Sequence, residues 1–128
     1  MKKIMAFLRP RKVNATKEVL AAAGFPAFTC RAALGRGKGV TDARLAEVTA
    51  HVLANSEELP YDEATVALTE LVRLLPIRLF ILAVEDDRVD DAVECIMRVN
   101  TTGHPGDGRI FVVDVTEAYC VRTGAEGL

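Results

Sequence analysis

A glycine-rich loop leads directly into a β-branched run in the sequence Thr101-Thr-Gly-His-Pro-Gly-Asp-Gly-Arg-Ile-Phe-Val-Val113. Glycine lets a backbone approach an anion closely, and successive N–H groups of such a loop can converge on one charged oxygen. Arg109, at the mouth of the strand, can neutralise remaining charge. These residues predict a phosphate cradle, while a hairpin loop without a ligand is the alternative that the loop alone leaves open.

Three further apolar runs precede the strand that we expect over Arg109–Val115. They cover Lys3–Leu8, Ala27–Leu34 and Ile77–Val84. Each run is long enough for a strand and is bounded by turn-forming or charged residues. Because the runs are apolar at most positions, both faces of the resulting sheet need cover. Association of several copies through the sheet is the economical way to provide it.

Two amphipathic helices are expected between these strands. The first has a predicted N-cap at Asn14 and ends at about Ala23. The second follows Asp86 and Asp87, whose carboxylates complement a helix N-terminus. Its predicted buried face consists of Val89, Ala92, Val93, Ile96 and Met97. The order β-α-β-β-α-β predicts an α+β, ferredoxin-like fold with an antiparallel sheet and two helices on one face.

Residues 40–75 form a long insertion between the second and third strands of this single domain, 1–128. Two segments with helical periodicity are separated by the turn-forming and acidic residues Asn55–Pro60. Permanent packing of both segments on the domain is one interpretation. A partner-binding loop that becomes ordered on meeting its target is the other, because so long a connection in a small domain is usually functional.

The composition excludes several classes of protein. A net charge of −2 gives no electrostatic reason to expect nucleic acid as a partner. No apolar run approaches the roughly 20 residues of a membrane span, so we expect a cytoplasmic protein. An RNA-recognition domain of this topology would need more stacking aromatics than Phe111. A small nucleotide-hydrolysing enzyme stays open as an alternative, although Asp107 is the only carboxylate in the loop.

Three motifs together resemble the PII family of nitrogen-regulatory signal-transduction proteins. They are Thr102–Val112, Arg122-Thr123-Gly124 and Gly35-Arg36-Gly37-Lys38. Within that family the sequence is most similar to the nitrogenase-associated branch, through phrases such as Gly24–Arg31 and through its lengthened central loop. The resemblance implies a non-catalytic regulator that forms a homotrimer or a mixed assembly with a sister PII protein.

The resemblance also implies that ATP or ADP lies in clefts between subunits. The implied binding residues are Thr29, Gly35, Gly37, Lys38, Gly106, Asp107, Gly108, Arg109 and Arg122. The stretch Gly106–Arg109 would surround the phosphates, and Arg122 would reach them from a neighbouring subunit. Thr29 would lie near the adenine, and the stretch Gly35–Lys38 would begin the partner-binding loop.

Magnesium and 2-oxoglutarate are further ligands of the family, and three departures bear on them. Gly39 stands in place of the usual glutamine, Ile77 in place of a lysine, and Cys120 in place of the first tail arginine. Each lost donor removes charge-assisted hydrogen bonds worth about 1.5 to 3 kcal/mol. The departures predict weaker nucleotide binding than is usual and remove donors that 2-oxoglutarate would need. The implied target is the dinitrogenase component, and another target, such as a membrane transporter, stays open.

Overall fold

The computed structural model describes residues 1–37 and 74–128. The helical segments predicted within residues 40–75 therefore lie outside the described residues, apart from Leu74 and Leu75 at their end. The chain divides into two compact units, which are Met1–Ala33 with Pro76–Leu128, and Leu34–Leu75. Within the described residues, no helix is long and apolar enough to cross a membrane.

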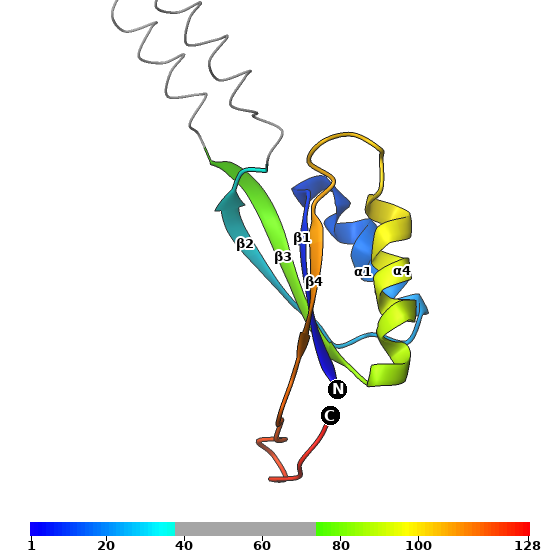
Figure 1. Ribbon diagram of the computed structural model, residues 1–128, viewed down its shortest axis with the longest axis vertical. Coiled ribbons are helices and arrows are strands. Elements are labelled where there is room, and N and C mark those ends of the chain that lie inside the picture. The colour runs from blue at the N-terminus through cyan, green and yellow to red at the C-terminus, as the bar shows by residue number, and fades with distance from the viewer. Residues whose placement is uncertain (38–73) are drawn as a thin grey trace, which may run out of the picture. The chain divides into compact units, whose positions relative to one another are not determined.

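The elements follow the predicted order. They are β1 (Lys2–Leu8), α1 (Val13–Ala22), β2 (Thr29–Gly35), β3 (Leu75–Val84), α4 (Val89–Asn100) and β4 (Arg109–Asp114). The sheet has the strand order β2-β3-β1-β4, and β1 pairs antiparallel with both β3 and β4. Figure 1 shows α1 and α4 packed together on one face of this sheet. The arrangement is α+β and is consistent with the predicted ferredoxin-like fold.

The core lies between the sheet and the two helices. Its buried residues are Ile4, Ala6, Leu8, Leu20, Phe25, Phe80, Leu82, Val84, Ala92 and Ile96. Alternate residues of β1 are buried, as expected for a strand with one covered face. Phe80 is fully buried, and its ring lies 5.3 Å from that of Phe28 between centroids. Burial of these side chains from both helices and from the two central strands, β1 and β3, fixes the sheet beneath the loop that precedes β4.

The opposite face of the sheet is apolar and carries no helix in the described part of the chain (Figure 1). Met5 stands at its centre, opposite Ile81 of β3 and Phe111 of β4. The ring of Phe7 meets that of Phe111 edge to face at 5.8 Å between centroids. Even so, Phe111 and Val113 are 45% and 42% exposed. This open face therefore presents the uncovered apolar surface that the strand sequences predict.

The start of α1 differs from the prediction. Asn14 lies inside the helix, and the N-cap is Lys12, which makes no side-chain capping bond. The chain leaves β1 through a 3-10 turn at Pro10–Lys12, and this turn runs directly into the helix. The N–H of Val13 donates to the carbonyl of Pro10, so the turn satisfies a donor that a capping side chain would otherwise serve.

The second helix also differs in detail. Asp86 and Asp87 lie in a 3-10 turn before α4 and form no capping bond with it. Met97 is 52% exposed and does not join the core. One turn away from the core residue Ile96, Asn100 is buried and donates to the Thr16 hydroxyl of α1 at 3.0 Å. A polar contact thus joins the two helices where the apolar pattern alone predicts none.

Candidate functional site

Asp107 closes the loop that connects α4 to β4, Thr101–Gly108. Its Oδ2 accepts the N–H groups of Thr102 at 2.7 Å and Gly103 at 3.0 Å. Its Oδ1 accepts the hydroxyl of Thr102. Because both carboxylate oxygens are engaged inside the loop, Asp107 serves to hold the loop's shape and is not a free base.

Arg9, at the end of β1, is a second anchor of this loop. Its Nη1 lies 3.0 Å from Oδ1 of Asp107 and 3.2 Å from Oγ1 of Thr102. Its Nη2 donates to the carbonyl of Pro105 at 2.8 Å. The sequence analysis does not identify Arg9, because a contact across more than 90 residues leaves no spacing signal. The only local hint is its charge between a strand and Pro10.

Two glycines allow the loop backbone to pass close to these anchors. Gly108 has φ +111°, and a Cβ there would lie 1.9 Å from the carbonyl oxygen of Phe7. Gly106 has φ +94°, and a Cβ there would lie 3.3 Å from Nη2 of Arg9. Glycine is therefore required at Gly108 by both space and backbone conformation. The close approach observed here is to the backbone of β1, whereas the sequence predicts an approach to an anion.

One backbone donor remains unpaired at the Gly106 end of the loop. The N–H of Gly106 makes no backbone hydrogen bond with residues 1–37 and 74–128, whereas the turn at Pro105–Gly106 directs the N–H of Asp107 toward the carbonyl of His104. Arg109 lies opposite Phe7, so its side chain belongs to the open face of the sheet. It is exposed and forms no ion pair with a described residue. An unpaired N–H three residues before a cation is an arrangement suited to an anion.

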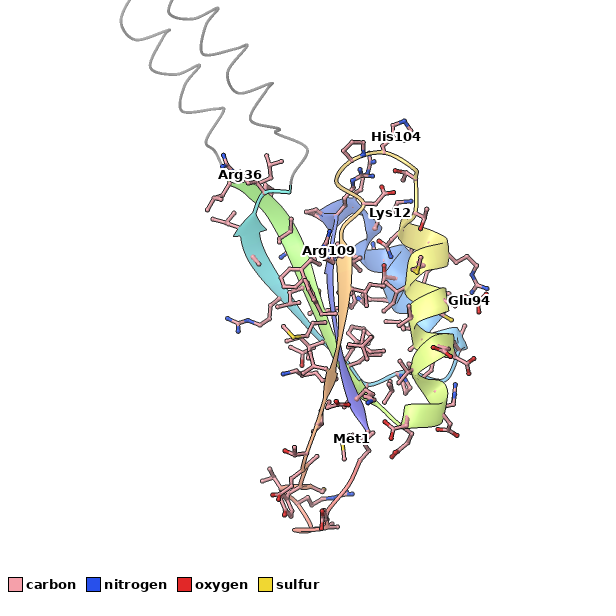
Figure 2. The ribbon with its side chains drawn as sticks, viewed as in Figure 1. Met1, Lys12, Arg36, Glu94, His104 and Arg109 are labelled. Atoms are coloured by element: carbon pink, nitrogen blue, oxygen red, sulfur yellow. The ribbon has the colours of Figure 1, made fainter. Side chains whose placement is uncertain are left out.

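His104 lies at the outer side of the loop, away from Arg109 at the start of β4 (Figure 2). Its ring Nδ1 lies 3.1 Å from the carbonyl of Thr102, and its N–H lies 3.3 Å from the hydroxyl of the same residue. These contacts are local and hold the Thr102 end of the loop. The contacts of His104 therefore belong to the Thr102 end of the loop and not to its Gly106 end.

Arg122 lies in a turn of the segment that follows β4, which ends at Asp114. The turn is held by its own backbone, since Gly124 N donates to the carbonyl of Cys120 at 2.7 Å and Cys120 N to that of Ala125 at 2.8 Å. Hydrogen bonds from Thr123 and the neighbouring backbone lower the pKa of the Cys120 thiol. The length of β4, roughly 17 Å, separates this turn from the loop. Arg122 and Arg109 of one chain are therefore not brought together.

Thr29 is the first residue of β2, which is the opposite edge of the sheet from β4. Three strand spacings, or about 14 Å, separate those edges. Gly35 ends β2 and Gly37 follows it, and both belong to the second unit. Lys38 lies outside the described residues. Within the first unit, Gly106–Arg109 form one continuous segment, and Thr29 and Arg122 lie apart from it.

The register of β3 shows which face of the sheet carries Ile77, the residue that stands where the resembled family has a lysine. Arg78 pairs with the buried Leu8, so it lies on the helix-covered side of the sheet, and its neighbour Ile77 belongs to the open face. This confirms that Arg78 does not take the place of the lysine expected at Ile77. The open face near the start of β3 lacks that cation.

The contacts of Asp107 hold its pKa at about 2, below the ordinary 3.8, chiefly because the hydroxyl and N–H of Thr102 donate to the carboxylate. A lowered pKa means that this carboxylate stabilises the loop fully above pH 3.8 and loses that effect as the pH falls through about 2. We expect the amide NMR signals of Thr102 and Gly103 to keep their positions until the pH drops below 3.8. In Asp107→Asn, the amide signals of Thr102 and Gly103 should already be displaced at neutral pH. A titration midpoint near pH 3.8 for these signals in the wild-type protein would contradict the hydrogen bonds described here.

Comparison with known proteins places these features in a family. The family model described as nitrogen regulatory protein P-II matches residues 1–125. A nitrogen fixation nifHD region GlnB-like protein 2 from Methanobacterium ivanovii is 41% identical over 127 residues, covering 99% of this chain and 96% of that protein. The protein of the same name from Methanothermobacter marburgensis is 40% identical over 127 residues, covering 99% of this chain and 97% of that protein. A nifHD region GlnB-like protein 1 from Methanothermococcus thermolithotrophicus is 38% identical over 130 residues, covering 100% of both chains. The chain therefore belongs to the nitrogen regulatory protein P-II family, whose members are oligomeric regulators that act on partner proteins.

Proposed function

We propose that this chain is a non-catalytic, nucleotide-sensing regulator of nitrogen metabolism that binds ATP or ADP. The observation that carries the proposal is the Gly106–Arg109 segment, where an unpaired backbone N–H at Gly106 is followed three residues later by an exposed cation. Preorganised backbone donors and a basic side chain are what a polyphosphate requires. The carboxylate in the loop is occupied by internal hydrogen bonds, which favours binding over catalysis.

The proposed site lies between subunits of a homotrimer, or of a mixed assembly with a sister P-II protein, in the cytoplasm. Thr29, Arg109 and Arg122 lie at three separate places on one chain. Association through the open face would cover Met5 and Phe111 and would allow the loop of one copy to meet the tail of the next. This arrangement accounts for an exposed arginine in a tail turn that packs on nothing nearby.

The relatives' names support a role in nitrogen fixation. They refer to the nifHD region, so the proposed target is the dinitrogenase component, contacted through the partner-binding loop, residues 40–75. Surface-captured protein should bind purified dinitrogenase component, and ATP should change the measured affinity. Equal binding with and without ATP would contradict nucleotide control of this target.

Magnesium with 2-oxoglutarate is the second ligand of the proposal. Ile77 places an apolar side chain on the open face where the family has a lysine, so we expect 2-oxoglutarate to bind more weakly than ATP. Calorimetric titration of 2-oxoglutarate into protein saturated with magnesium and ATP measures this directly. Ile77→Lys should strengthen the binding.

Titration calorimetry with ADP and ATP tests the nucleotide site. Wild-type protein should bind either nucleotide in the micromolar range, and Arg109→Ala should weaken binding about tenfold or more, because a charge-assisted contact to phosphate is lost. Arg98→Ala, which removes an exposed cation from α4, is the matched control and should change little. Absence of heat at millimolar nucleotide would refute the proposal, and a turnover near 10 per second would identify an enzyme instead.

Mixing two variants that bind nucleotide weakly tests whether the site is shared between subunits. Arg109→Ala removes the loop cation and Arg122→Ala removes the tail cation. Trimers refolded from an equal mixture should regain about a quarter of the wild-type sites by random assortment around the ring. If nucleotide binding does not recover on mixing, either both arginines serve the same subunit's site or one of them does not take part in the site.

A further inference from the structure

Arg9 extends from a rigid part of the sheet. Leu8, the residue before it, is buried in the core and pairs with Arg78 of β3. Pro10 follows with a restricted φ, and the carbonyl of Arg9 accepts the N–H of Lys12 at 3.0 Å. The backbone of Arg9 is therefore fixed on both sides, and its side chain can hold a more exposed segment in place.

The guanidinium of Arg9 reaches the beginning, the middle and the end of the loop. It contacts Oγ1 of Thr102 at 3.2 Å, the carbonyl of Pro105 at 2.8 Å and Oδ1 of Asp107 at 3.0 Å. These contacts use two nitrogens of one planar fork. A lysine ammonium is a single atom and cannot reproduce that spread of donors.

The guanidinium of Arg9 also lies against the Gly106 end of the loop. A Cβ on Gly106 would come within 3.3 Å of Nη2, so the backbone of Gly106 rests on the fork. None of the loop residues that Arg9 contacts belongs to the hydrophobic core. Loss of Arg9 should therefore loosen the loop and leave the fold of the sheet and helices intact.

We propose that Arg9 is a positioning residue for anion binding, which holds the unpaired N–H of Gly106 in place without itself contacting the ligand. The inference rests on the proposed function, because it assigns Arg9 to the same nucleotide site. Donors that are already ordered lose less conformational freedom on binding, so affinity depends on the residue that orders them. Arg9 thus acts on the nucleotide through the loop.

Three variants test this assignment. Arg9→Ala removes every side-chain contact, Arg9→Lys keeps the charge and loses the fork, and Arg11→Ala removes a neighbouring exposed arginine that forms no side-chain hydrogen bond or ion pair with the described residues. We expect Arg9→Ala to weaken ADP binding about tenfold and Arg9→Lys to recover only part of that loss. Arg11→Ala should bind as the wild type does. Hydrogen exchange of the Thr102 and Gly103 amides, which donate to Asp107, should be faster without nucleotide in both Arg9 variants.

The outcomes separate this inference from the proposed function. If wild-type protein binds ADP and Arg9→Ala binds it equally well, the positioning role is overturned and the nucleotide site stands. If wild-type protein binds no ADP, the proposed function fails and the inference fails with it. If Arg9→Lys loses the cooperative thermal transition together with binding, Arg9 supports the whole fold, and the positioning role is again overturned.

Discussion

Gly108→Ala is expected to abolish measurable ADP binding and to lower the free energy of unfolding by about 2 to 4 kcal/mol. The added Cβ would lie 1.9 Å from the carbonyl oxygen of Phe7, which is backbone and cannot rotate away. The residue would also have to hold φ +111°, a conformation that alanine strongly disfavours. Either β4 separates locally from β1 or the loop leaves its anchors. Denaturant unfolding followed by circular dichroism, together with calorimetry, measures both effects.

Gly103→Ala is the matched control within the same loop. Gly103 has φ +80°, but a Cβ there would meet nothing within 4 Å. We expect a loss of about 1 kcal/mol from backbone strain alone, with ADP binding largely retained. Equal effects of the two substitutions would show that strain, rather than the contact with β1, determines the role of Gly108.

Met5→Glu is expected to dissociate the protein into monomers and to weaken ADP binding about 100-fold or more, because an unpaired carboxylate in an apolar interface costs several kcal/mol. Met5 lies at the centre of the open face, between Ile81 and Phe111. A nucleotide site that takes its parts from two chains would be lost with the assembly. Analytical ultracentrifugation gives the oligomeric state, and calorimetry on the same sample gives the affinity.

Ala21→Glu is the control for the added charge. Ala21 is exposed on α1, on the side of the domain that carries the helices. The variant should keep both the assembly and the wild-type affinity. If Met5→Glu also assembled and bound normally, the open face would not be the surface through which subunits meet, and a site shared across it would be excluded.

The sequence predicts the strands and helices of this fold because each has a clear periodicity. β1 and β3 are apolar over most of their length, and the buried residues Ile96 and Leu20 fall on the expected helical faces. The glycines that precede Arg109 identify the loop before β4, but the contact of Gly108 with the backbone of β1 is known only from the structure. These features depend on local chemistry, which a single sequence records.

The remaining features depend on contacts between distant residues. The bond between Asn100 and Thr16 and the contacts of Arg9 with the loop join residues 84 or more positions apart. Asn14 looks like a cap because the 3-10 turn before α1 has no strong sequence signal. The family resemblance assigns Arg122 and Thr29 to the site and implies that Arg122 comes from a neighbouring subunit, but it gives no position for Thr29, which the structure places at the opposite edge of the sheet from β4.

The edge strand β4 has a consequence for the biogenesis of the protein. It has a hydrogen-bonding neighbour on one side only, and Phe111, Val112 and Val113 are each more than two-fifths exposed. A newly made copy therefore carries an aggregation-prone edge until another surface covers it. Arg109 and Asp114 bracket this run as charged gatekeepers, so replacing Arg109 should also make the nascent chain less soluble during synthesis.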